Sequence, residues 1–361
     1  MTAEPASVDI ELPVGAIEEF FSERAKAVDS GDADLRAGLR YLAELGLLAH
    51  PELQVSCDVV TAVARCCLAS AFSVWAHTMV AEYLSMSASP RLQSQVPRLR
   101  DAAVIGSTAM APAMQNLVGL ADLGVRFTRN DDVLVVDGAV RWASNLFADG
   151  FLVVFGAAGA AGGDDRERVI VAVPSDAPGV VAGPPLGLLA LGATCSSNVT
   201  FDKVRVDPEW VVSTQFDTYL RAVKPRFLLL QSAFCIGLAQ AAVASARSGL
   251  GRSFDVFQAE HNRLTATLGL IEERQRRLVG SLGPARSVVE HRLEAAEIAQ
   301  AAVALELRVT GGGGYRAPSP TSRRVREAAF LPIQSPTEGH LRWELARTHG
   351  AGDTPMTSSV R

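Results

Sequence analysis

The feature that most constrains this fold is a series of three long helical stretches in the last part of the chain. Apolar residues recur there at helical spacing over residues 219–250, 254–282 and 285–309. Each stretch is about twice as long as the ~11–12-residue average helix of globular proteins. Residues that end helices stand at the junctions: Gly251, Gly283-Pro284 and Gly311 to Gly314. Long helices joined by short breaks predict a helical bundle.

The residues before this bundle divide into a helical part and a β part. Between residues 14 and 88 the apolar residues follow helical spacing, and 57–86 is predicted as one helix buried on several sides. Alternating, β-branched segments then predict strands at 103–110 (ending before Pro112), 125–128, 133–142, 151–156, 169–174 and 199–206. We therefore predict an α+β fold with an N-terminal helical domain (1–102), a central β domain (103–211) and a C-terminal helical bundle (212–361).

Composition excludes several classes of function. A net charge of −5 gives no reason to expect nucleic acid or an anionic membrane as a partner. No apolar run reaches the ~18 residues of a spanning helix, and the N-terminus lacks the apolar core of a signal peptide. The five cysteines form no CxxC pair and the six histidines are scattered. We expect a cytoplasmic protein with buried thiols and no metal site.

A glycine-rich segment, 156–163, follows a predicted strand and invites comparison with a phosphate-binding loop. It lacks both GxGxxG and GKS/T, and Asp164 to Glu167 lead into another strand. The segment is therefore predicted as a hairpin connection. The basic run from Arg323 to Arg326 is followed by Glu327 and is predicted as a helix face.

Four segments carry a resemblance to a known family. The strand that ends in Trp142-Ala143-Ser144-Asn145 is the first, and taken alone its aromatic and hydroxyl pair is more often core than a ligand site. The second runs from Arg247 through Gly251 to Gln258. The third runs from Gly311-Gly312-Gly313-Gly314-Tyr315 to Ser335-Pro336-Thr337, and the fourth is 107–112, Ser-Thr-Ala-Met-Ala-Pro.

Together, over nearly the whole chain from Leu35, these segments resemble the acyl-CoA dehydrogenase family of FAD enzymes. The resemblance implies a C-terminal four-helix bundle and FAD between it and the β domain. It gives Trp142 the role of covering the isoalloxazine and Ser144 that of bonding flavin N5. Arg247 and Gln258 are implied to reach the FAD of a neighbouring subunit, so a homodimer or homotetramer is expected.

Other cofactor contacts are implied at both ends of the site. Gly311 and Gly312 let the backbone approach the cofactor, and Thr337 stands at a helix start, which attracts anions. Met110 occupies a place where the family often has a flavin-bonding hydroxyl. Asn116 falls where a serine contacts pyrophosphate or thioester.

The catalytic base of the family is missing from both of its usual places. One of them is Ser335 in this chain, and the other is about Phe227. Ser335 is predicted as a helix N-cap, with Pro336 at the first helical position and Glu338 completing a capping box. A catalytic hydroxyl at Ser335 remains the alternative, and Glu338 is the nearest acid.

The resemblance is strongest to the short acyl-ACP dehydrogenases that make hydroxymalonyl or methoxymalonyl extender units for polyketides. We expect an FAD-dependent dehydrogenase acting on an acyl thioester, held by a carrier protein or by CoA. Oxidation of an alcohol- or aldehyde-level carbon need not begin with abstraction of an α-proton, so the missing carboxylate is tolerable. Two alternatives remain open: a flavin-dependent monooxygenase on the same fold, and a non-redox member that has lost its flavin.

Overall fold

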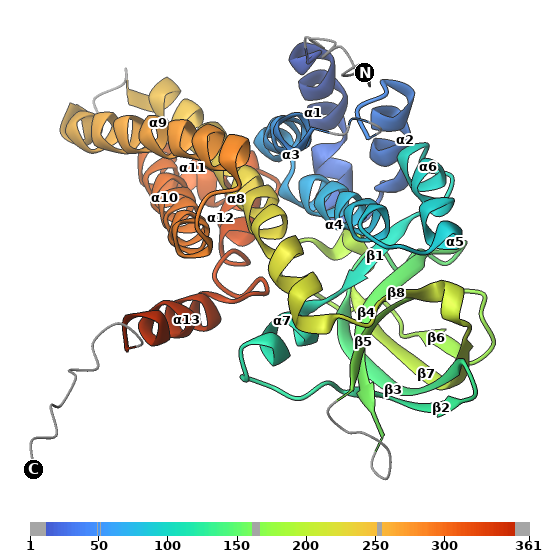
Figure 1. Ribbon diagram of the computed structural model, residues 1–361. Helices are drawn as coiled ribbons and strands as arrows, with labels where there is room; N and C mark the ends of the chain where they lie inside the picture. The colour runs from blue at the N-terminus through green and yellow to red at the C-terminus, as the bar shows by residue number, and fades with distance from the viewer. Residues whose placement is uncertain (1–11, 49, 51, 161–166, 251–254, 351–361) are drawn as a thin grey trace, which may run out of the picture.

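The computed structural model describes residues 12–48, 50, 52–160, 167–250 and 255–350, and it has the predicted α+β architecture. N-terminal helices and a C-terminal bundle lie on either side of α8, which runs from the β domain into the bundle (Figure 1). The two boundaries between the three domains stay predictions. The N-terminal helices are α1 (Val14–Ser30), α2 (Arg36–Glu44), α3 (Leu53–Cys66), α4 (Leu68–Ser85), α5 (Pro90–Gln93) and α6 (Gln95–Arg100).

The predicted single helix over 57–86 is wrong, because the chain breaks between α3 and α4. Cys67 has extended backbone angles, φ −158° and ψ 114°. Neither glycine nor proline stands there. Two side chains of α12 (Pro320–Ala328) replace the lost helical bonds: Arg323 donates to the carbonyl oxygen of Cys66, and Glu327 accepts from the N–H of Leu68 at 3.1 Å. The burial predicted for this segment is confirmed, since most residues of α4 are buried.

The β domain is an eight-stranded sheet within the described residues. Its strands run in the order β6-β7-β3-β2-β4-β5-β8, and β1 pairs in parallel with β4. One face packs on the helical core, and the other encloses a second core centred on Phe155 and Phe201. The strands are β1 (Gly106–Ala109), β2 (Val125–Asn130), β3 (Val133–Ala143), β4 (Leu152–Gly159), β5 (Arg168–Pro174), β6 (Val180–Ala182), β7 (Ser197–Val206) and β8 (Val211–Ser213).

Two details of this domain differ from the prediction. The first strand is shorter, and Pro112 lies in the first turn of α7 (Ala111–Leu117), where its missing N–H costs no hydrogen bond. β6 and β8 are three residues each, too short for the alternation to show. The antiparallel pairing of β4 and β5 confirms the expected hairpin, but β4 continues to Gly159, so residues 156–159 belong to the strand and not to the predicted connection. Its turn, 161–166, lies outside the described residues.

The C-terminal bundle follows the predicted helices closely. α8 (Phe216–Gly249) is 34 residues long and meets the length and composition of a membrane-spanning helix, but 83% of its apolar window is buried inside the protein. It therefore serves as the core helix. The others are α9 (Gln258–Ser281), α10 (Ala285–Thr310), the short α11 (Gly312–Tyr315), α12, and α13 (Glu338–Gly350).

Candidate functional site

The end of β3 presents an exposed aromatic ring next to a buried hydroxyl. Trp142 is 56% exposed, which is unusual for a tryptophan and leaves a ring face open. Ser144, two residues on, is buried, and its Oγ lies 2.8 Å from Oγ of Ser196. The hydroxyl of Ser196 is in turn 2.8 Å from Oγ1 of Thr194. The predicted pair is therefore joined to a loop that the sequence did not single out.

Asn145 fixes this strand end to the rest of the protein. Its Nδ2 donates to the carbonyl oxygens of Ser73 (3.0 Å) and Gly106 (3.1 Å), and its Oδ1 accepts from the Ser73 hydroxyl at 2.7 Å. Its own N–H bonds Thr194 at 2.8 Å. The backbone has φ 63°, a region that asparagine enters more readily than most residues. Asn145 thus joins α4, β1 and the loop before β7.

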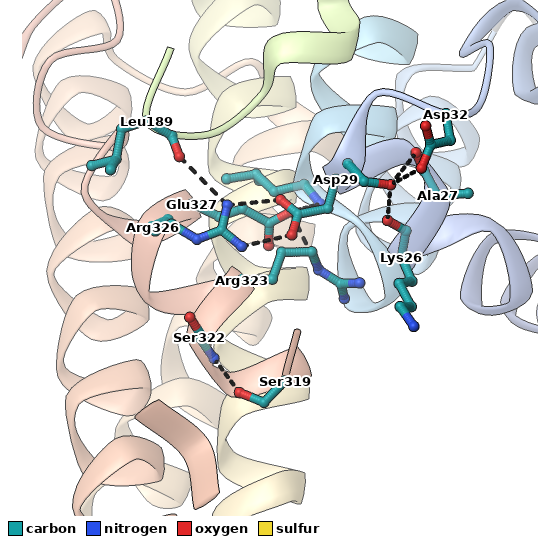
Figure 2. Close-up of polar contacts among 12 residues, drawn as sticks. Lys26, Ala27, Asp29, Asp32, Leu189, Ser319, Ser322, Arg323, Arg326 and Glu327 are labelled. Carbon is teal, nitrogen blue, oxygen red and sulfur yellow. Dashed lines mark hydrogen bonds and ion pairs between the residues drawn. The ribbon is translucent and has the colours of Figure 1, made fainter. Parts of the chain in front are cut away.

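That loop is anchored to α12 and α1 by one arginine. Arg326 makes a bidentate pair with Asp29 at the end of α1, with distances of 2.8 and 2.6 Å. Figure 2 shows the same guanidinium reaching the carbonyl oxygen of Leu189, at 3.4 Å. The pairing raises the pKa of Arg326, so the anchor stays charged. The helix predicted at 323–326 is confirmed, but its arginine side chains face the protein interior and bond to other groups of the chain.

The start of α13 corrects the predicted helix cap. Thr337, not Ser335, is the cap: its Oγ1 accepts from the N–H of His340 at 3.2 Å, and its carbonyl oxygen accepts from the N–H of Leu341. Glu338 is the first helical residue and accepts from Arg342 one turn on, so no capping box forms. The carbonyl oxygen of Ser335 instead accepts from Gln231 of α8 at 2.9 Å.

Two side chains here hold buried polar atoms without a hydrogen-bond partner among the described residues. One is Oγ of Ser335, and the other is His340, both of whose ring nitrogens are unpartnered although the residue is only 4% exposed. Burial and the nearby charge of Lys224 lower the pKa of His340 to about 4. Its imidazole is therefore neutral near pH 7. The sequence offered no spacing signal for His340.

The predicted contacts on the bundle lie apart from this region. Arg247 and Gln258 are exposed, and Gln258 bonds only its neighbour Asn262 (2.7 Å) among the interactions seen. Arg247 stands sixteen residues beyond Gln231 on α8, or about 24 Å at 1.5 Å per residue. Gly311 and Gly312 are also exposed, with open space beside each Cα. One chain does not bring these residues to Ser335.

The two residues predicted near the first strand are used by the fold. Met110 is 1% exposed and packs in the helical core. Asn116 accepts from Arg168 at 2.9 Å and donates to the carbonyl oxygen of Ala121 at 3.0 Å. Arg168 continues to Asp217 at the start of α8. Neither prediction is tested by this, but the polar atoms of Asn116 already have partners.

Two expectations from composition can be compared with the structure. No group of three or more metal-ligating side chains occurs in the part of the chain that is described. All five cysteines are free; four are buried, and Cys195 is partly exposed. Burial raises the pKa of the thiols, so they are protonated and unreactive.

We compared the sequence and the structure of this chain with those of known proteins. No protein-family profile matches the chain. Benzylmalonyl-CoA dehydrogenase of Aromatoleum aromaticum (strain DSM 19018 / LMG 30748 / EbN1) is 25% identical over 360 aligned residues, covering 91% of this chain and 94% of that protein. Glutaryl-coenzyme A dehydrogenase, solved with glutaryl-CoA, superposes with a TM-score of 0.85 at 16% identity, covering 98% of both chains. The chain is thus similar in sequence to this curated acyl-CoA dehydrogenase and has the acyl-CoA dehydrogenase fold.

A further member of this fold is more specialised. FkbI, described as acting in biosynthesis of the methoxymalonyl extender unit of the polyketide Fk520, superposes with a TM-score of 0.79 at 18% identity. The match covers 94% of this chain and 99% of FkbI. The acyl-CoA dehydrogenase fold predicted from the sequence is thereby confirmed.

Proposed function

We propose that this protein is an FAD-dependent oxidoreductase that acts on an acyl thioester. The observation that carries the proposal is the open ring of Trp142 beside the hydroxyl chain of Ser144, in a chain that is similar to an acyl-CoA dehydrogenase. The residues present fit the cofactor. Trp142 offers a face for a planar ring, exposed glycines offer close approach at Gly311 and Gly312, and Ser335 and His340 hold unpartnered polar atoms.

Each side chain has a defined task in this proposal. FAD, when bound, supplies the chemistry of accepting a hydride from the substrate. Trp142 would stack on the flavin and exclude water, and Ser144 would contact flavin N5. Arg247, near the end of α8, and Gln258, the first residue of α9, would bind the FAD of a second subunit, because they lie far from the other residues. The proposed assembly is therefore a homodimer or homotetramer in the cytoplasm.

Removal of the substrate proton requires a group other than the carboxylate of the family. Ser335 and Phe227 are not carboxylates, and Glu338 is bonded to Arg342. The neutral imidazole of His340 is a chemically competent acceptor close in sequence to Ser335. It lies beside the ion pair of Lys224 and Glu344, in which the carboxylate of Glu344 favours a proton gained by the imidazole and the ammonium of Lys224 opposes it.

We propose further that the substrate is a hydroxylated short acyl group on an acyl carrier protein, made as a polyketide extender unit. Oxidising an alcohol carbon breaks an O–H and a C–H bond, which requires a base for the hydroxyl proton but no carboxylate beside Cα. The likeness to FkbI supports this choice of substrate.

Purified protein tests the proposal directly. The preparation should be yellow, and an acyl-ACP of this type should bleach the flavin absorbance without added reductant. If only the acyl-CoA bleached the flavin, the carrier would be CoA and not a carrier protein, and the proposed reaction would stand. A requirement for NAD(P)H before any flavin change would favour the monooxygenase alternative, and protein that takes up no FAD would contradict the proposal. Light scattering of the same sample measures the assembly.

A further inference from the structure

A chain of three hydroxyl groups ends at Ser144. Its Oγ lies 2.8 Å from Oγ of Ser196, which lies 2.8 Å from Oγ1 of Thr194. Oγ1 of Thr194 is then 2.7 Å from the carbonyl oxygen of Leu191. All three hydroxyl side chains are buried. Two oxygens this close require a proton between them, and each hydroxyl has only one.

The direction of the protons follows from the far end of this chain. A carbonyl oxygen has no proton to give, so the hydroxyl of Thr194 must donate to Leu191. Thr194 therefore accepts from Ser196, and Ser196 accepts from Ser144. The single hydroxyl proton of Ser144 is thus used inside the protein. Toward anything bound beside it, Oγ of Ser144 offers lone pairs only.

The backbone holds this arrangement in place. The N–H of Thr194 also bonds the carbonyl oxygen of Leu191, at 3.0 Å, and the carbonyl oxygen of Thr194 accepts from Asn145 at 2.8 Å. Leu191 and Cys195 both adopt left-handed backbone angles, φ 61° and 48°, which are strained for residues other than glycine. Arg326 bonds the same loop at Leu189, as described above.

We propose that Thr194 and Ser196 are positioning residues that make Ser144 a hydrogen-bond acceptor toward the flavin. The inference rests on the proposed function, in which Ser144 contacts flavin N5. That nitrogen carries hydrogen when the flavin is reduced and none when it is oxidised. An acceptor therefore bonds the reduced form and only faces a lone pair in the oxidised form. The relay makes this chain bind reduced FAD more tightly, relative to oxidised FAD, than a donor would.

Thr194→Val tests the relay because valine keeps the shape of threonine and removes its hydroxyl. The proton of Ser196 then turns to Ser144, and the proton of Ser144 is freed to point at N5. We expect the ratio of affinities for reduced and oxidised FAD to fall about tenfold. For a two-electron couple this lowers the reduction potential of the bound flavin by about 30 mV, measured by dye-linked titration.

Thr200→Val is the matched control. Its hydroxyl lies on β7, donates to the carbonyl oxygen of Val181 at 3.3 Å, and joins no relay, so the potential should not change. A potential that Thr194→Val leaves unchanged would overturn the inference, and if that variant does not fold, Ser196→Ala frees the same proton and decides. A wild-type protein that takes up no FAD would instead contradict the proposed function, and this inference with it.

Discussion

Two regions of the molecule treat their polar side chains in opposite ways. Around α4 and α12 the charged and polar groups are bonded within the chain: Arg324 to Glu306, Arg326 to Asp29, and both nitrogens of His77 to backbone groups. At the start of α13 and the end of α8, Ser335, His340 and Arg247 have no bond of this kind in the described residues. The first region holds the fold together, and the second is available to a ligand.

The largest effect should come from the buried pair in the first region. Arg324 donates to Glu306 from Nε at 2.8 Å, and the carboxylate side chain is wholly inaccessible to solvent. Arg324→Met leaves that charge buried without an ion-pair partner, with the hydroxyl of Thr321 still donating to it at 2.6 Å, and should cost about 3–5 kcal/mol. Arg247→Met, in the second region, should change the free energy of unfolding by less than about 0.5 kcal/mol. Equal losses for the two variants in urea unfolding would remove the contrast.

The two histidines sharpen the comparison. In His77, Nε2 donates to the carbonyl oxygen of Leu99 (2.8 Å), and Nδ1 accepts from the N–H of Gly106 (3.0 Å). His77→Leu orphans both partners and should cost about 2–4 kcal/mol. His340→Leu orphans none, so it should keep the stability and the bound flavin but lose turnover. If His340→Leu failed to fold, His340 would have a structural role only. If the variant kept full turnover, His340 would have no role in the reaction.

Lowering the pH should reveal the contribution of His77 to stability. Burial lowers the pKa of His77 from 6.5 to about 4, so the unfolded chain binds the extra proton first as pH falls. Stability contributed by the neutral ring is therefore complete above pH 6.5 and is lost as pH falls towards 4. Between pH 7 and pH 5 this amounts to about 2 kcal/mol. Urea unfolding at pH 7 and pH 5 measures this: the free energy of unfolding should fall less in His77→Leu than in the wild type, by that amount.

Local pattern predicted most of the fold and part of the site. The stretch predicted at 285–309 is α10, Ala285–Thr310, because its apolar spacing and flanking breakers act within the helix itself. The break at Cys67 was not predictable, since Arg323, which caps it, lies 257 residues away from Cys66. His340 and the relay through Thr194 were missed for the same reason. The role of each of these residues depends on its neighbours in space, and a single polar residue produces no periodic pattern in the sequence.

The exposed end of α8 should respond to ligand and not to unfolding. In the proposed assembly Arg247 pairs with the pyrophosphate of FAD on a second subunit, a charge-assisted contact worth about 1.5–3 kcal/mol. Arg247→Ala should therefore weaken FAD binding at least about tenfold, measured by titrating the apoprotein, and leave the unfolding midpoint of the apoprotein unchanged. Arg308→Ala is a matched control, because Arg308 is exposed nearby and paired with Glu260 within the chain. Equal weakening by both variants would count against the specific contact.

The smallest difference lies between two hydroxyl residues that are neighbours in the chain. Thr337 caps α13 through the N–H of His340, so Thr337→Ala should lower the free energy of unfolding by about 1 kcal/mol. Ser335 has a buried, unpartnered Oγ, so Ser335→Ala removes no bond and should be neutral or slightly stabilising in the apoprotein. With FAD and substrate present the order should reverse for turnover, because an unpartnered hydroxyl contributes only once a ligand bonds to it. If Ser335→Ala cost as much stability as Thr337→Ala, the hydroxyl would belong to the first region after all.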